Sequence, residues 1–162
     1  STLTNALTNK WVLAEDKLFA TLGTSVGKMF VPATYNEDSW AYIPPKEILV
    51  NDTIGFIREL PPKLVDAFAS TLEDSIESNV LLHVIDAADP KVNLKIDVVD
   101  EILKKIGANQ TRIIVCNKMD QVSGEEVKQW LLERFKGEQI VFISAQEKQG
   151  LDELKTLIQD NL

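Results

Sequence analysis

The sequence has little sulfur and a deficit of positive charge. Its single cysteine, Cys116, excludes an internal disulfide, and its place in an apolar run predicts a reduced protein with this thiol in the core. The 17 basic residues are outnumbered by 25 acidic ones, which gives a formal net charge of −8. We therefore expect no broad basic face that holds nucleic acid by bulk electrostatics, although a local basic patch stays possible.

Long apolar runs, linkers and repeats are also missing. No stretch approaches the roughly 20 apolar residues of a membrane-spanning helix, and the N-terminus lacks the basic-then-apolar pattern of a signal peptide. No Pro/Gly-rich or low-complexity segment divides the 162 residues, a length that suits one ordinary domain. The expectation is a soluble, cytoplasmic, monomeric protein with a single domain over residues 1–162.

The sequence does contain short apolar runs that alternate with longer helical patterns. The runs have the length of buried strands and lie at Lys28–Pro32, Glu47–Asn51, Val80–Ile85, Arg112–Cys116 and Gln139–Ile143. Helices are predicted from Pro61 to Ile76, from Val92 to a stop at Gly107, from Gly124 to Phe135 and from Leu151 to Leu162.

This alternation predicts an α/β fold with three layers, in which a mostly parallel sheet carries helices on both faces. The exception is the segment Lys28 to Asn51, where two strand-like runs flank a polar, aromatic stretch. That segment predicts an antiparallel hairpin at one edge. Ligands of such sheets bind at the carboxyl ends of the strands, where the loops gather.

A candidate base-recognition motif, Asn117-Lys118-Met119-Asp120, follows one predicted strand without a gap. The Asp120 carboxylate can accept both N–H groups of a guanine base, and adenine has no such donor pair. Asn117 would brace the loop and the base edge, while the stem of Lys118 would lie over the ring. A lone motif of this kind also occurs in solvated turns.

Two further motifs stand at strand ends. In Asp52-Thr53-Ile54-Gly55, the Asp52 carboxylate can hold the water shell of Mg²⁺, and the Gly55 amide can approach a terminal phosphate. In Ile143-Ser144-Ala145, a small residue would let a backbone N–H reach the guanine oxygen. Each motif alone fits an ordinary loop, but three in this order, each at a strand end, predict a guanine-nucleotide site.

These residues carry a resemblance to a known family. The run from Asp52 to Pro61, with Leu64–Phe68 and Thr71–Glu73, resembles the switch II region of the HflX family of GTPases. Similar to that family too are Asp16–Leu22, Leu81–Pro90 and Gly150–Leu154. The resemblance covers nearly the whole chain except about residues 23–46. It implies a P-loop GTPase-like domain that binds GTP and GDP with Mg²⁺ and hydrolyses GTP.

The family's phosphate-binding loop, G-x-x-x-x-G-K-[ST], matches only at its last residue. Residues Ser1–Thr8 resemble the Ser and the helix that follow the Gly-Lys pair, so we expect the chain to begin inside this loop. The resemblance implies nucleotide contacts from Ser1 and Thr2, and Mg²⁺ contacts from Ser1, Thr21 and Asp52. After Thr21 the sequence departs from the family pattern. The segment Gly23–Met29 has one residue too few between its glycines and is not a second P-loop.

Phe56 occupies the place after Gly55 where many small GTPases have a water-positioning Gln. An apolar ring cannot orient water, so we assign no catalytic side chain and expect slow hydrolysis without a partner. HflX-like proteins are associated with ribosomes, especially the large subunit, and carry an additional N-terminal domain. The resemblance therefore implies a ribosomal partner. The alternative is a non-catalytic module without a P-loop that uses the fold for protein contacts.

Several other residues have structural interpretations. His83 stands alone in its strand and is expected to be a core or strand-end histidine with satisfied hydrogen bonds, and a ligand is the less favoured alternative. Asp86 is expected to cap or brace the loop that follows it, and a direct contact with the nucleotide is the less favoured alternative. Trp11, Trp40 and Tyr42 are expected to anchor the edge hairpin, although a recognition surface is the alternative.

Overall fold

The computed structural model describes residues 2–8, 25–35, 40–52 and 76–162. It contains two compact units, Ser1–Ile57 and Arg58–Leu162. The single domain expected from the chain length stays a prediction. The predicted helix from Pro61 lies outside the described residues except for its last position, and so does Trp11.

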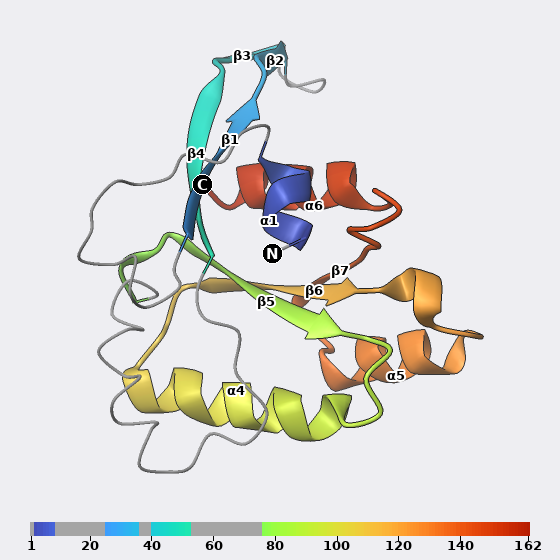
Figure 1. The fold of residues 1–162 in the computed structure, drawn as a ribbon. Helices are drawn as coiled ribbons and strands as arrows, with labels where there is room; N and C mark the ends of the chain where they lie inside the picture. The colour runs from blue at the N-terminus through green and yellow to red at the C-terminus, as the bar shows by residue number, and fades with distance from the viewer. Residues whose placement is uncertain (1, 9–24, 36–39, 53–75) are drawn as a thin grey trace. The chain divides into compact units, whose positions relative to one another are not determined.

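The first unit is built around a two-stranded antiparallel ribbon. Strand β1 (Ser25–Val31) pairs with β4 (Lys46–Asp52), and the short strands β2 (Thr34–Tyr35) and β3 (Tyr42–Ile43) pair beyond them (Figure 1). The hairpin predicted between Lys28 and Asn51 is therefore confirmed. Helix α1 (Thr2–Leu7) belongs to the same unit.

Side chains alternate along this ribbon, as a strand period of two requires. Met29 and Val31 are buried, whereas Phe30 and its diagonal neighbour Leu49 are exposed. Gly27 lies on the buried side, where a Cβ would come within 2.7 Å of Thr8 Cγ2. The absence of a side chain at Gly27 thus lets the end of α1 approach the strand closely.

The second unit holds a parallel sheet of three strands in the order β5-β6-β7. These strands span Val80–Asp86, Thr111–Asn117 and Gln139–Phe142. The register pairs Asp86 with Asn117 and Cys116 with Phe142. The carboxyl ends of all three strands therefore meet at one edge of the sheet.

Helices cover both faces of this sheet (Figure 1). The three helices α4, α5 and α6 span Val92–Ile106, Glu126–Arg134 and Leu151–Asp160. Ile114 and Cys116 of β6 pack with Ile96 of α4 and Leu131 of α5. Because side chains alternate along a strand, Ile113 and Val115 point to the opposite face, where α6 lies. The predicted three-layer α/β architecture is confirmed in this unit.

Two predictions about element ends and the core are also confirmed. Gly107 ends α4 in the left-handed conformation, with φ 71°, and the amide of Ala108 donates to Leu103 O at 3.0 Å. Cys116 is fully buried, and burial raises the pKa of its thiol to about 12. The thiol therefore stays protonated and unreactive at neutral pH. Among the described helices, none has the length and apolarity to cross a membrane.

His83 is a core residue, as predicted, but one of its ring nitrogens lacks a hydrogen bond to the residues that the structure describes. It is 8% exposed, meets the ring of Phe135 edge-on, and its Nδ1 finds no hydrogen-bond partner among the described residues. The pKa of His83 is lowered to about 4, first by burial and also by the charges of the Arg112 and Arg134 guanidinium groups, while Asp100 opposes the shift. The sequence could not reveal this because the neighbours come from other elements.

The described aromatic residues of the hairpin that were expected to anchor it, Trp40 and Tyr42, are both exposed. Trp40 is 82% exposed, so the expectation that it anchors the hairpin is wrong. Tyr42 is also largely exposed, and it contacts Tyr35 across the short strands with ring centroids 5.5 Å apart. Cross-strand aromatic pairing thus replaces burial in a core at this site.

We predict that His83 makes the protein less stable at mildly acidic pH. Its pKa in the folded chain, about 4, lies below the ordinary value of 6.5, so the unfolded chain binds more protons between these values and stability falls as pH decreases through this window. Between pH 7 and pH 5 the loss should be about 2 kcal/mol. Urea unfolding at both pH values measures it, and His83→Gln should lose correspondingly less. Equal losses in the two proteins would contradict this account.

Candidate nucleotide-binding site

The residues predicted to bind the base lie at one edge of the parallel sheet. Asn117 is the last residue of β6, and Ser144 and Ala145 follow the end of β7. Lys118 and Asp120 lie in the turn after β6, where η2 (Met119–Gln121) forms a single 3₁₀ turn. The structure therefore brings these five residues to adjacent loops.

The Asn117 side chain joins the two loops. Its Oδ1 accepts a hydrogen bond from the Lys118 amide at 2.8 Å and a second from the Ala145 amide at 3.0 Å. The backbone adds a third link, since the Met119 amide donates to Ile143 O at 3.1 Å. An amide side chain with an acceptor oxygen is what this junction needs, because two backbone N–H groups converge on it.

The side chain of Lys118 contacts β5, the strand that pairs with β6 on the side away from β7. Its backbone is in the left-handed conformation with φ 65°, which residues with side chains rarely adopt. Its Nζ lies 2.6 Å from Asp86 Oδ2. The other carboxylate oxygen of Asp86 accepts a hydrogen bond from the Ala88 amide at 3.1 Å. The expectation that Asp86 braces its own loop is confirmed, and the ion pair with Lys118 is an additional contact.

Asp120 is presented to solvent. It lies in the η2 turn and is exposed, and within the described part of the chain its carboxylate forms no hydrogen bond or ion pair. Its neighbours Asn117 and Lys118 are both engaged in internal contacts. Asp120 is thus the acidic group of this loop that is available to accept two N–H groups from a ligand.

The loop after β7 is compact, and its first residues are buried. Ser144 and Ala145 are 1% and 4% exposed. Ser144 exchanges two backbone hydrogen bonds with Gln149, and its Oγ accepts one from the Glu147 amide at 3.1 Å. Because the Ala145 amide already donates to Asn117, a contact with a guanine oxygen would require this donor to be shared or to exchange partners. The role given to Ala145 therefore stays a prediction.

The first unit contains one described residue of the predicted metal set, Asp52 at the end of β4. Its Oδ2 accepts a hydrogen bond from Thr4 Oγ1 of α1 at 2.8 Å. Thr8 Oγ1 in turn donates to Thr4 O at 2.7 Å, and Thr2 is exposed at the start of α1. Ser1, Thr21, Gly55 and Phe56 lie outside the described residues.

This arrangement fits Mg²⁺ better than a metal that needs many protein ligands. Mg²⁺ binds oxygen and keeps several waters, so one or two protein oxygens suffice. No group of three or more His, Cys, Asp or Glu side chains gathers among the residues that the structure describes. A half-buried carboxylate at a strand end, steadied by a threonine hydroxyl, is the kind of ligand that such a site uses.

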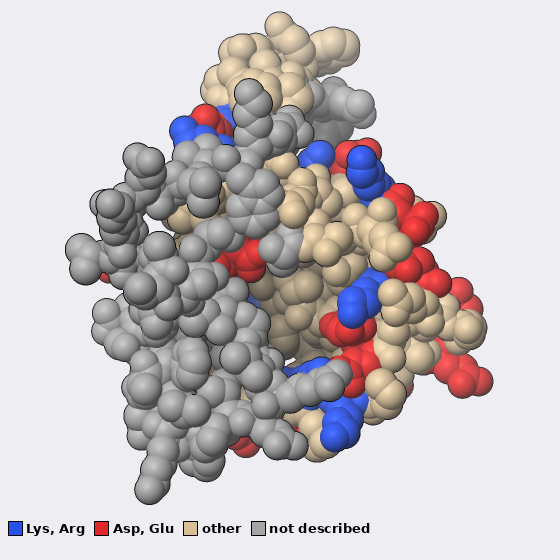
Figure 2. Space-filling model, in the orientation of Figure 1, with Lys and Arg blue, Asp and Glu red and all other residues tan. Residues whose placement is uncertain are grey.

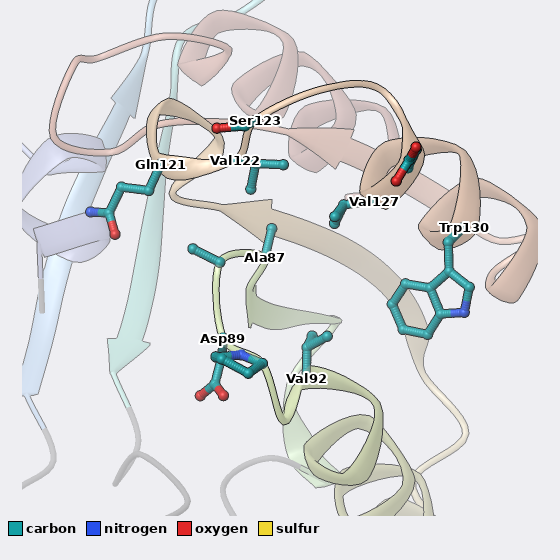
Figure 3. A pocket seen from close by; sticks show the side chains of 11 residues that line it. Ala87, Asp89, Val92, Gln121, Val122, Ser123, Val127 and Trp130 are labelled. Atoms are coloured by element: carbon teal, nitrogen blue, oxygen red, sulfur yellow. The ribbon is translucent and has the colours of Figure 1, made fainter.

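A separate pocket of about 450 Å³ lies beside the base loop in the second unit (Figure 3). Its wall comes from the loop after β5, the start of α4, the end of η2 with the residues after it, and α5. The lining includes Ala87, Asp89, Val122, Val127 and Trp130. None of the predicted base-binding residues lines it. The pocket is therefore not the predicted nucleotide site.

The surface charge agrees with the composition. On the face shown in Figure 2, acidic and basic side chains lie side by side, and no continuous basic patch is visible among the described residues drawn there. Ion pairs among the described residues, such as Arg112–Asp100 and Arg134–Asp97, likewise join opposite charges. Bulk attraction to nucleic acid finds no support on this face.

Comparison with known proteins agrees with the fold and the motifs. The sequence model of the family described as "50S ribosome-binding GTPase" matches residues 1–118. A solved structure of Aquifex aeolicus Era is similar with a TM-score of 0.66 and 26% identity, and the similarity covers 100% of this chain and 52% of that chain. The chain belongs to the 50S ribosome-binding GTPase family.

Within this family the relatives named GTPase HflX are similar over nearly the whole chain. The protein from Caldanaerobacter subterraneus is 41% identical over 167 residues, which cover 100% of this chain and 34% of the relative. The protein from Escherichia coli K12 is 36% identical over 163 residues, with 100% and 35% covered. The resemblance to HflX GTPases is confirmed. The chain spans about a third of the length of these relatives.

We predict that Gly150, the N-cap residue just before α6, is essential to the loop after β7. Its φ of 72° is left-handed, and a Cβ would collide with Phe142 O and come within 3.0 Å of Ile143 Cγ2. Gly150→Ala should therefore destabilise the protein by about 1–3 kcal/mol more than a change that costs backbone strain alone.

Gly107→Ala is the matched control, because Gly107 has φ 71° and nothing within 4 Å of its Cβ position. Urea unfolding of both variants measures the difference. Equal destabilisation would show that the crowding at Gly150 is relieved without cost.

Proposed function

We propose that this chain is the guanine-nucleotide-binding part of a GTPase that works on the ribosome. The observation that carries the proposal is the loop after β6. Asn117 ties that loop to β7, Lys118 is tied to β5, and Asp120 is left exposed between them. Relatives over the whole chain are named GTPases, and the similar Era structure is described as bound to GDP·AlF4⁻.

On the base side, Asp120 would accept the two N–H groups of guanine and thereby select it over adenine. Lys118 would lay its aliphatic stem over the ring, and Asn117 would hold the loops on either side of the base. Ser144 and Ala145 would close the site from the end of β7. In this site one carboxylate would bind the base, and the other groups would hold the loops in place. Such an arrangement suits a site that is already formed before the ligand binds.

On the phosphate side, Ser1, Thr2, Thr21, Asp52 and Gly55 would contact the phosphates or the metal. Mg²⁺ would neutralise charge on the phosphate oxygens when bound. Asp52 would act through the metal or its water shell, and Thr4 would keep the carboxylate in place. The amide of Gly55 would sense the terminal phosphate.

The partner we propose is the large ribosomal subunit, which also implies a cytoplasmic location. Support comes from the family description, which names the 50S ribosome. The net charge of −8 argues that this chain does not grip RNA by bulk attraction. Other parts of the full-length protein would then bind the ribosomal RNA. This chain, which we expect to act as a monomer, would provide the nucleotide-dependent switch.

We predict that Asp120→Asn exchanges base specificity. The amide loses one acceptor for guanine and gains a donor for the second oxo group of xanthine, so GTP affinity should fall by about tenfold to a hundredfold while affinity for xanthosine triphosphate rises. Competition titrations of the full-length protein measure both. Asp152→Asn, on the exposed side of α6, is the control and should change neither affinity. Undiminished GTP binding by Asp120→Asn would remove the base assignment.

We predict that the full-length protein hydrolyses GTP slowly alone and faster on large ribosomal subunits. Phe56 cannot orient the attacking water, so a partner must supply a group that does so or stabilise the active conformation. We expect large subunits to raise the rate of hydrolysis by about tenfold or more. Single-turnover hydrolysis with and without large subunits tests this, with small subunits as the control. Fast hydrolysis alone would refute the role given to Phe56. No acceleration at saturating large subunits would refute the proposed partner.

A further inference from the structure

We infer that Asp86 is a positioning residue for base recognition. Its carboxylate holds the Lys118 side chain in the orientation in which its stem would contact the base. This inference rests on the proposed function and names a group that the motifs at the strand ends do not include. Asp86 ends β5 and lies opposite Asn117 in the parallel register. The two residues therefore stand at the same level of the sheet edge.

The two oxygens of the Asp86 carboxylate have separate tasks. Oδ1 accepts a hydrogen bond from the Ala88 amide at 3.1 Å, which fixes the orientation of the carboxylate. Oδ2 accepts a charged hydrogen bond from Lys118 Nζ at 2.6 Å. The Ala87 amide also donates to Asn117 O at 3.0 Å, so the backbones on both sides of the pair are joined. A carboxylate fixed in this way offers the ammonium group one defined place.

The pair does little for folding, which favours a role toward a ligand. The side chains of Lys118 and Asp86 are 47% and 34% exposed, and ion pairs this open to water contribute little to stability. The strained φ of 65° at Lys118 adds to this argument, since strain of this kind gathers at functional sites.

Without the ion pair, the four-carbon stem of Lys118 would sample many rotamers, and binding would have to order it. With the pair, the stem runs from the loop after β6 toward the end of β5 before any ligand arrives. Preorganisation of this kind raises affinity by lowering the entropy lost on binding. Because this stem would contact the base and not the phosphates, the affinities for GDP and for GTP should rise by the same factor.

The chain offers a closely matched control in Asp89. Its Oδ1 accepts a hydrogen bond from the Lys91 amide at 2.8 Å, and its Oδ2 pairs with Lys95 Nζ. Asp89 thus repeats the chemistry of Asp86 three residues later, but its lysine lies on α4 and not in the base loop.

The experiment compares Asp86→Asn with Asp89→Asn in the full-length protein. Asparagine keeps an acceptor for the loop amide and removes the charge. Calorimetric titration with GDP and with a non-hydrolysable GTP analogue should show a loss of about threefold to tenfold for Asp86→Asn, equal for both nucleotides. Asp89→Asn should bind as the unchanged protein does, and both variants should have similar melting temperatures.

A double-mutant cycle with Lys118→Met separates positioning from a general structural effect. In the Lys118→Met background, Asp86→Asn should have no further effect on affinity. The inference is overturned if Asp86→Asn leaves affinity unchanged, or if it lowers affinity equally with and without the Lys118 ammonium. If the unchanged protein binds neither nucleotide, the proposed function itself fails, and this inference fails with it.

Discussion

The candidate site depends on the contacts of one side-chain oxygen, Oδ1 of Asn117. It accepts hydrogen bonds from the backbone amides of Lys118 and Ala145, which lie in the loops after two adjacent parallel strands. Parallel strands carry their loops to the same edge but do not by themselves hold those loops together. The paired amides would be left without this acceptor if Asn117 were replaced by an apolar residue. The geometry of both loops therefore follows from this junction.

The remaining contacts of the site extend that junction in two directions. Toward β5, the pair of Lys118 with Asp86 fixes the lysine side chain. Toward α6, the left-handed Gly150 lets the loop after Ser144 turn closely over the end of β7. These restraints concern bracing groups, whereas Asp120 stays exposed for a ligand. A preformed frame around one free carboxylate loses little entropy when a base binds.

Much of the second unit was predictable from the sequence. Buried parallel strands are continuously apolar, and the run Val80–Ile85 matches β5 to within one residue. Helix α4 and its stop at Gly107 followed from a helical period and a glycine cap. The exposure of Trp40 was not predictable, nor was the lack of a partner for His83 Nδ1 among the described residues, because burial and hydrogen bonding depend on residues distant in the sequence.

The sequence by itself determined which chemical groups stand at the strand ends and in what order, because that information lies in local runs such as Asn117 to Asp120. The tertiary structure decided how those groups share their hydrogen bonds. Ala145 and Asn117 are 28 residues apart, and Lys118 and Asp86 are 32 apart. No local pattern specifies such pairs. They arise from the parallel register of β5, β6 and β7, which places three carboxyl ends at one edge and sets them within hydrogen-bonding distance.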